Sequence, residues 1–170
     1  MRRPFASLGL GLLLATSGCA GSSLRNGIYS DDQARYRIGD LPSGFERVEV
    51  GDNDLAFHHR GDGTISVNAT CTDYEDVPLS ALVNHLLFET TERHFAIEET
   101  VTLDGRAARH VLVQAELDGV PIELELYVMK KDGCVIDLAH IRTQNASPAA
   151  REVFRAFVAR FALLEVHRDA

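Results

Sequence analysis

The sequence lacks the motifs that most often identify an enzyme. It contains no Gly-x-Ser-x-Gly nucleophile elbow, no Gly-rich phosphate loop and no His-Glu-x-x-His zinc motif. It also lacks a long hydrophobic run, because the apolar stretch over 8–15 is far shorter than the roughly 20 residues of a transmembrane helix. These absences favour a non-catalytic protein without a cofactor and argue against a retained membrane-spanning helix.

Positive charge is scarce as well. The chain has 17 Lys and Arg against 25 Asp and Glu, a formal net charge of −8 at pH 7. Nucleic acid and anionic lipid headgroups repel such a chain, so we expect neither as a partner.

Seven histidines are present, but their spacing does not predict a metal site. His58 and His59 point to opposite faces if they lie on a strand. His85 and Glu89 share one helical face, but a catalytic zinc site normally needs three protein ligands. We therefore predict no bound metal.

The N-terminus has a basic start, a short apolar run and small residues before a cysteine. Two arginines precede the run over 8–15, and residues 16–18 precede Cys19. This order is typical of a bacterial lipoprotein signal peptide over 1–18, whose removal leaves Cys19 as the lipidated N-terminus. The sequence thus predicts a cell-envelope protein attached to a membrane through its N-terminal lipid.

Several details refine this location. Thr16 stands where lipoprotein signals more often have Leu, so an ordinary secretory signal with an incidental cysteine is the alternative. Ala20 occupies the position where Asp favours inner-membrane retention, which slightly favours the outer membrane. Residues 19–35 are rich in Gly, Ser, Asn and Asp, and we interpret them as the lipidated cysteine followed by a flexible tether. Residues 36–166 then form a single domain in the periplasm.

Asp-Gly pairs punctuate this domain. They occur at 62–63, 104–105, 118–119 and 132–133. Asp-Gly between alternating apolar residues is a strong signal for a two-residue hairpin turn. We therefore predict an antiparallel meander of four strands, over about 96–103, 106–117, 120–131 and 134–143. The turn at 118–119 places Val113 opposite Leu124, so that apolar side chains meet along one face.

The opposite face of this meander carries charge at one end. The same register pairs Glu125 with His140 and Glu123 with Arg142. The other end of the face is apolar and can accept a helix, whereas we expect the charged end to lie in solvent, outside the footprint of the C-terminal helix. These four residues are our candidates for binding a partner.

Two helices complete the predicted layout. Pro78 opens a helix with an apolar stripe, and Ser147 is the expected N-cap of a second helix that starts with Pro148. A hairpin around Asp62-Gly63 needs a longer loop or a bulge to align its apolar residues. The prediction is an α+β sandwich: an antiparallel meander sheet with one helix before the meander and one C-terminal helix.

This order of elements resembles the PsbP-like domains of bacterial envelope lipoproteins. The resemblance covers about residues 36–164 and includes the segments 54–57 and 104–108 and the helix after Ser147. It implies a PsbP-like sandwich and a binding or assembly role without catalysis. The absence of tryptophan departs from the pattern expected near the first strand.

Cys71 and Cys134 are the two cysteines besides Cys19. In an oxidising periplasm they are expected to form a disulfide, and two buried, inert thiols are the alternative. A redox-active role has little support, because the chain has no Cys-x-x-Cys arrangement.

Three classes of function stay open at this point. The favoured one is a non-catalytic envelope lipoprotein that binds a protein partner or supports an envelope transport or assembly complex. Its partner surface is either the charged end of the meander or the exposed side of the first helix. The alternative is a periplasmic carrier of a lipid or small apolar ligand, and a hydrolase is the least favoured. A large apolar pocket favours the carrier, whereas a packed core with an exposed patch favours the partner.

Overall fold

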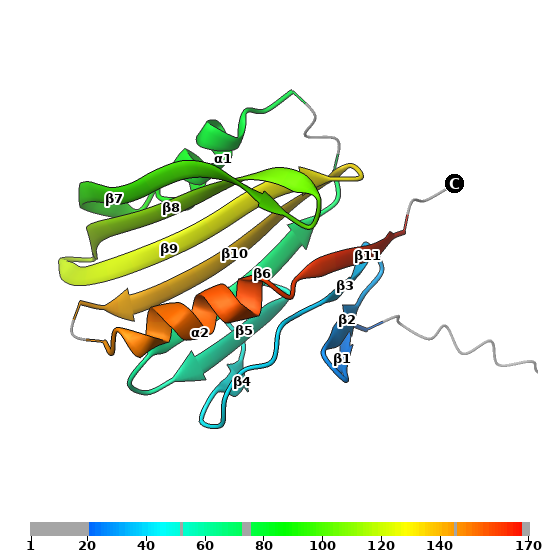
Figure 1. The fold of residues 1–170 in the computed structure, drawn as a ribbon, viewed down its shortest axis with the longest axis horizontal. Coiled ribbons are helices and arrows are strands. Elements are labelled where there is room, and N and C mark those ends of the chain that lie inside the picture. The colour runs from blue at the N-terminus through cyan, green and yellow to red at the C-terminus, as the bar shows by residue number, and fades with distance from the viewer. Residues whose placement is uncertain (1–20, 52, 73–75, 145, 168–170) are drawn as a thin grey trace, which may run out of the picture.

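The computed structural model describes residues 21–51, 53–72, 76–144 and 146–167, which form two antiparallel sheets and two helices (Figure 1). The predicted signal peptide and Cys19 lie outside the described residues. The large sheet contains β4 (Glu46–Val48), β5 (Leu55–His59), β6 (Gly63–Thr70), β7 (Thr90–Leu103), β8 (Arg106–Leu117), β9 (Val120–Lys131) and β10 (Cys134–Thr143). The small sheet contains β1 (Ser23–Arg25), β2 (Ile28–Ser30), β3 (Ala34–Arg37) and β11 (Ala162–Val166). The helices are α1 (Leu79–Leu86) and α2 (Ala149–Val158).

The predicted meander is confirmed as the strand order β10-β9-β8-β7 within the large sheet. Three of its strands have the predicted bounds, whereas β7 begins six residues before the predicted start at 96, at Thr90. Each Asp of the three Asp-Gly turns has a positive φ of 47–54°, which the two-residue hairpin turn requires. Val113 lies opposite Leu124, as predicted.

The hairpin formed by β5 and β6 has the longer loop that the sequence predicts. His59 pairs with Gly63, which leaves residues 60–62 as the loop. Phe57 then lies opposite Ile65, so the apolar residues of both strands share one face. On the other side β6 pairs with β10 and joins this hairpin to the meander.

The small sheet corrects the predicted flexible tether over 19–35. Residues 23–35 contribute to β1, β2 and β3, and β3 pairs with β11 from the other end of the chain. Asn26 and Gly27 both have positive φ and form a hairpin turn rather than part of a linker. Tyr29 and Tyr36 are buried and stack at a centroid distance of 4.8 Å. Their burial stabilises this sheet, and the folded domain therefore starts at Ser23 rather than at 36.

The helices cover opposite faces of the large sheet. On one face, Val83 and Leu87 join the apolar core that contains Val111 and Leu126. On the other, Phe154 and Phe157 of α2 join a core that includes Tyr36 of the small sheet, and Figure 1 shows α2, in orange, lying across this face. Both predicted helices are confirmed, but α2 begins at Ala149 with Pro148 as its N-cap, instead of the predicted Ser147. No described helix is long and apolar enough to cross a membrane.

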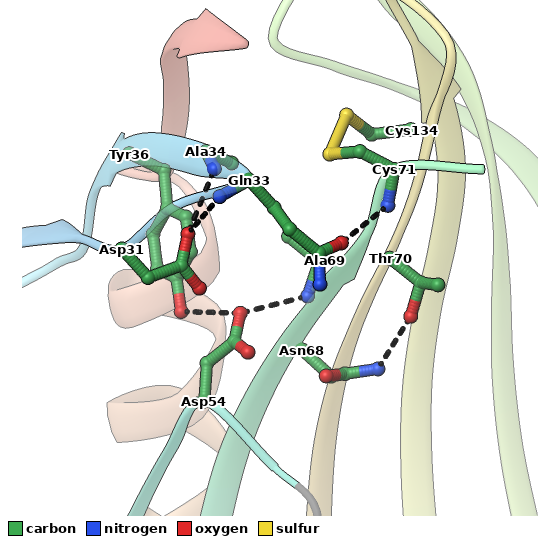
Figure 2. The surroundings of a disulfide bond; sticks show 10 residues. All are labelled: Asp31, Gln33, Ala34, Tyr36, Asp54, Asn68, Ala69, Thr70, Cys71 and Cys134. Atoms are coloured by element: carbon green, nitrogen blue, oxygen red, sulfur yellow. Dashed lines mark hydrogen bonds between the residues drawn. A yellow bond between two sulfur atoms is a disulfide. The ribbon is translucent and has the colours of Figure 1, made fainter. Parts of the chain in front are cut away.

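The predicted disulfide between Cys71 and Cys134 is present, with an S–S distance of 2.10 Å (Figure 2). It forms because Thr70 of β6 pairs with Val135 of β10, which brings the neighbouring cysteines together. The backbone N–H of Cys71 donates a hydrogen bond to Gln33 Oε1 at 3.1 Å, which ties the disulfide region to the small sheet.

Asp54 makes a second tie between the two sheets (Figure 2). Its Oδ2 accepts hydrogen bonds from the Tyr36 hydroxyl at 3.1 Å and from the N–H of Ala69 at 2.9 Å. Burial raises the pKa of Asp54 to about 6.

Candidate functional site

The four charged residues singled out in the sequence do meet on one sheet face. His140 lies opposite Glu125 and Arg142 opposite Glu123, as predicted. The prediction that they lie in solvent is wrong. Their relative exposed areas are only 5% for Glu123, 2% for Glu125, 1% for His140 and 7% for Arg142. The helix α2 lies over this end of the face as well as over the apolar end, and its arginines contact the carboxylates.

Glu123 is held by two arginines. Arg142, on the neighbouring strand, donates from Nε to Glu123 Oε1 at 2.8 Å. Arg151, on α2, donates from its own Nε to the same oxygen at 2.8 Å, and each arginine also donates through a terminal nitrogen. Burial opposes ionisation of Glu123, but the hydrogen bonds from Arg151 and Arg142 outweigh it and hold the pKa below its ordinary value.

Glu125 is held by a histidine and an arginine. Its Oε1 lies 2.9 Å from His110 Nε2 and 2.9 Å from Arg155 Nε. The other ring nitrogen of His110 lies 3.0 Å from Glu99 Oε1, and the ring stacks on Tyr127 at 4.2 Å. Burial opposes ionisation of Glu125, but the hydrogen bonds from His110 and Arg155 outweigh it and lower the pKa.

The pKa values of His110 and His140 are shifted in opposite directions, although burial disfavours the charged form of both. Burial disfavours the charged form of His110, but hydrogen bonds to Glu125 and Glu99 outweigh it and raise the pKa. Burial lowers the pKa of His140, which donates a hydrogen bond from Nε2 to the carbonyl oxygen of Asp62 at 2.7 Å. We therefore assign His110 as an imidazolium between two carboxylates and His140 as a neutral ring.

The chemistry of this cluster fits a structural tie between α2 and the sheet. Each buried carboxylate accepts charge-assisted hydrogen bonds from two cationic side chains, and the lowered pKa values leave neither suited to act as a general acid at neutral pH. Sequence reasoning missed Arg151, Arg155, His110 and Glu99. The signal for the arginines was their spacing of four residues, which places both on one face of a helix opposite the two glutamates.

No group of three or more His, Cys, Asp or Glu side chains suited to hold a metal ion occurs in the described part of the chain. A groove of about 380 Å³ lies beside the cluster, between α2 and β7. His110, Tyr127 and Arg155 line its polar side, and Ile97 and Val101 its apolar side. The groove therefore borders the ion pairs, but the charged groups of His110 and Arg155 already contact Glu125.

Two exposed aromatic side chains lie on the α1 side of the large sheet. Phe88, just after the end of α1, is 80% exposed, and Phe95 of β7 is 46% exposed. Phe95 lies opposite Val113, whose side chain belongs to the core under α1, so Phe95 emerges on that same face. We call these two side chains the Phe88/Phe95 surface.

The Phe88/Phe95 surface is built on a firmly held turn. Arg93 donates hydrogen bonds to the carbonyl oxygens of Leu87, Phe88 and Thr90, with Nε 3.1 Å from the oxygen of Thr90. It thereby satisfies carbonyl groups at the C-terminal end of α1. The strand β7 is the last strand in the order of the large sheet, so this surface adjoins a sheet edge.

Comparison with known proteins identifies the fold but no close relative. No protein-family model matches the sequence, and no curated protein does. Among solved structures, cyanobacterial PsbP (CyanoP) from Synechocystis sp. PCC 6803 is 15% identical, with a TM-score of 0.57, over 95% of this chain and 100% of its own. LpqN of Mycobacterium tuberculosis, described as involved in cell envelope biogenesis, is 11% identical, with a TM-score of 0.54, over 78% of this chain and 86% of its own.

A third similar structure is PA94 from Pseudomonas aeruginosa, described as a protein of unknown function and putative regulator. It is 14% identical, with a TM-score of 0.52, over 84% of this chain and 95% of its own. These likenesses agree with the order of strands and helices described above. The chain has the PsbP-like α+β fold.

Proposed function

We propose that the protein is a non-catalytic binding protein of the bacterial envelope, anchored by lipid on Cys19 and active through contact with a protein partner. The N-terminal pattern up to Cys19 supports export and anchoring. The disulfide between Cys71 and Cys134 supports an oxidising compartment such as the periplasm. The fold shared with LpqN, an envelope biogenesis protein, supports the same location.

The Phe88/Phe95 surface is the observation that carries the partner-binding role. Two large aromatic side chains remain in solvent although the same face of the sheet has a packed apolar core. Exposed aromatic groups beside polar residues are typical of protein interfaces, because their burial provides much of the binding free energy. The second of the two sequence-based options was the exposed side of the first helix; this surface lies next to that helix, but neither phenylalanine belongs to α1.

The charged cluster is a poor candidate for the same role. Glu123, Glu125, His140 and Arg142 are covered by α2 and already paired, so a partner would have to displace a helix to reach them. The lowered pKa values of the two glutamates also support a non-catalytic protein. We therefore propose the Phe88/Phe95 surface, instead of the charged cluster, as the partner surface.

The test is crosslinking of the acylated protein in its own envelope, followed by purification and identification of the attached protein. We expect Phe88→Ala with Phe95→Ala to reduce capture of that partner at least about tenfold, which is the effect of losing about 1.4 kcal/mol of binding free energy. Leu164→Ala is the matched control, because Leu164 is 43% exposed on β11, in the other sheet.

The control should capture as much partner as the unchanged protein. Circular dichroism should show equal folding of all variants, since none of the substituted side chains belongs to the buried core. Undiminished capture by the double variant would rule out the Phe88/Phe95 surface as the partner site. Equal loss in the Leu164→Ala control would show that the effect is not specific to that surface.

A further inference from the structure

A groove of about 520 Å³ lies between α1 and the large sheet. Leu82 and Leu86 of α1 form one wall, whereas Val128 and Val135 belong to the floor. Its volume is in the range of about 300–1,000 Å³ that is usual for small-molecule sites. Neither Phe88 nor Phe95 lines this groove, so binding in the groove is independent of the Phe88/Phe95 surface.

The groove exists because α1 covers only part of its sheet face. The helix packs mainly against β8 and β9, and β10 and β6 continue the face beyond it. On β6 the buried apolar side chains point to the α2 face. The alternate residues Asn68 and Thr70 therefore point to the α1 face, where they line the groove. The floor thus combines apolar valines with polar side chains of β6.

Asp137 is the charged group of this floor. It is 8% exposed and lies opposite Asn68 on β6 and Val128 on β9. Asn68 makes a side-chain hydrogen bond with it, and no ion pair within the described ranges involves it. No Lys or Arg is among the described residues that line the groove. A buried carboxylate without a cation is costly, because the amide replaces only part of its lost hydration.

Asp137 therefore gives the groove a preference for the sign of a ligand's charge. Burial raises the pKa of Asp137 to about 6, so the carboxyl group is mainly ionised at pH 8. A cationic group placed beside it would form a charge-assisted hydrogen bond in a partly dehydrated site. A carboxylate or phosphate would meet like charge with no Lys or Arg of the described lining to offset it.

We propose that this groove binds a small amphiphile whose cationic nitrogen pairs with Asp137 and whose apolar part lies against Leu82, Val128 and Val135. Amines and guanidines fit this description, whereas fatty acids do not. Thr70 and Asn68 offer further polar contacts next to the carboxylate, and His85 lies at the exposed side of the groove. The apolar carrier considered from the sequence becomes a site for cationic amphiphiles.

The test measures binding of three probes with the same alkyl chain: octylamine, octanoate and octanol. The full chain is used with Cys19→Ser, so that no acyl chain competes for the groove, and titrations run at pH 8, where an alkylamine is protonated. Calorimetry gives each Kd, and NMR follows the methyl signals of Leu82, Val128 and Val135. We expect octylamine to bind at least about tenfold more tightly than octanoate, with octanol between them.

Asp137→Asn keeps the shape of the side chain and removes its charge. It should weaken octylamine binding about tenfold and bring the three probes to similar affinities. Asp54→Asn is the matched control, because Asp54 is a second carboxyl with a pKa raised to about 6 but lies among Tyr36 and Ala69, outside the groove. It should leave the preference for octylamine unchanged.

Ala81→Phe is a second, independent variant. Ala81 is an exposed residue of α1 that lines the groove, so a larger side chain there obstructs the site without disturbing the core. It should weaken binding of all three probes. Equal affinity for octanoate and octylamine, an unchanged preference in Asp137→Asn, or probe-induced shifts confined to other parts of the protein would each overturn the proposal.

Discussion

Two buried carboxyl groups on opposite faces of the same sheet show how local partners determine ionisation. Glu125 accepts hydrogen bonds from His110 and Arg155, and its pKa is lowered in spite of burial. Asp137 has an amide partner, Asn68, and burial raises its pKa to about 6. The difference arises from the presence or absence of a buried cation, since both side chains are almost inaccessible to solvent.

This difference gives a pH-dependent prediction for Asp137→Asn. The pKa of Asp137 is higher in the folded state than in the unfolded chain, so its ionisation destabilises the fold as pH rises from about 4 to about 6. The negative charge of Asp54 acts in the same direction. We expect the variant to gain stability relative to the unchanged protein by about 2 kcal/mol at pH 8 and by little at pH 4.

Denaturant unfolding at a series of pH values measures this gain. Asp32→Asn is the control, because Asp32 is an exposed carboxylate of the small-sheet region. Its replacement should change stability by less than about 0.5 kcal/mol, because the side chain is exposed. A stability gain for Asp137→Asn that is the same at pH 4 and pH 8 would contradict the assigned pKa shift.

At the scale of elements, α2 is attached to the sheet by charge as well as by apolar packing. Its phenylalanines Phe154 and Phe157 are fully buried, and its arginines Arg151 and Arg155 reach the buried glutamates. A buried ion pair contributes little net stability compared with apolar residues, but removal of one partner leaves an uncompensated charge. The arginines therefore fix where α2 lies on the sheet.

Arg151→Met with Arg155→Met tests this attachment. Removal of one partner of a buried pair typically costs about 3–5 kcal/mol, but both arginines are partly exposed, and Arg142 and His110 remain beside the glutamates. We therefore expect a loss of about 2 kcal/mol in the free energy of unfolding. Hydrogen exchange should become faster for the amides of α2.

Arg160→Met is the matched control for the loss of an arginine. Arg160 lies just beyond α2 and is 3.7 Å from Asp40, and both side chains are largely exposed. Its replacement should change stability by less than about 1 kcal/mol. If the double variant of α2 were as stable as this control, the arginines would not be what holds the helix in place.

The elements that could be predicted from the sequence are those whose signals are local. Each Asp-Gly turn determines the register of its own hairpin, so the pairing of Glu125 with His140 followed directly. The small sheet could not be predicted in this way. Its strands are three to five residues long, and β3 pairs with β11 from the opposite end of the chain.

The environment of the charged cluster required non-local information as well. Register placed Glu123 and Glu125 on one face but said nothing about what covers that face. The position of α2 depends on the apolar packing of Phe154 and Phe157 and on the two arginines together. The cross-strand register of the cluster could therefore be predicted, whereas its burial and its contacts with His110, Arg151 and Arg155 could not.

For the whole molecule, the proposed envelope location depends on how the domain is anchored. The fold occurs in proteins described in different terms, including CyanoP and a putative regulator, and fold alone does not determine function. Location must therefore be tested on this chain. The relevant residue is Cys19, on which the proposed anchoring depends.

We predict that Cys19→Ser releases the protein from the membrane fraction and abolishes incorporation of labelled palmitate, because the acyl chains provide the anchoring free energy. Fractionation and metabolic labelling measure the two effects. The joint variant Cys71→Ser with Cys134→Ser is the control, since it removes the other two cysteines and should keep the label. Labelling that persists in Cys19→Ser would show that the acyl group is attached elsewhere.

The small sheet starts close to Cys19, which limits how far an anchored domain can extend from the membrane surface. Four residue steps separate Cys19 from Ser23, where β1 begins, and a fully extended chain covers at most about 3.5 Å per step, or about 14 Å in total. With lipid on Cys19, the domain would remain next to the headgroups instead of ranging across the periplasm. It could then meet only partners embedded in that membrane or brought to its surface, and it would search for them in two dimensions.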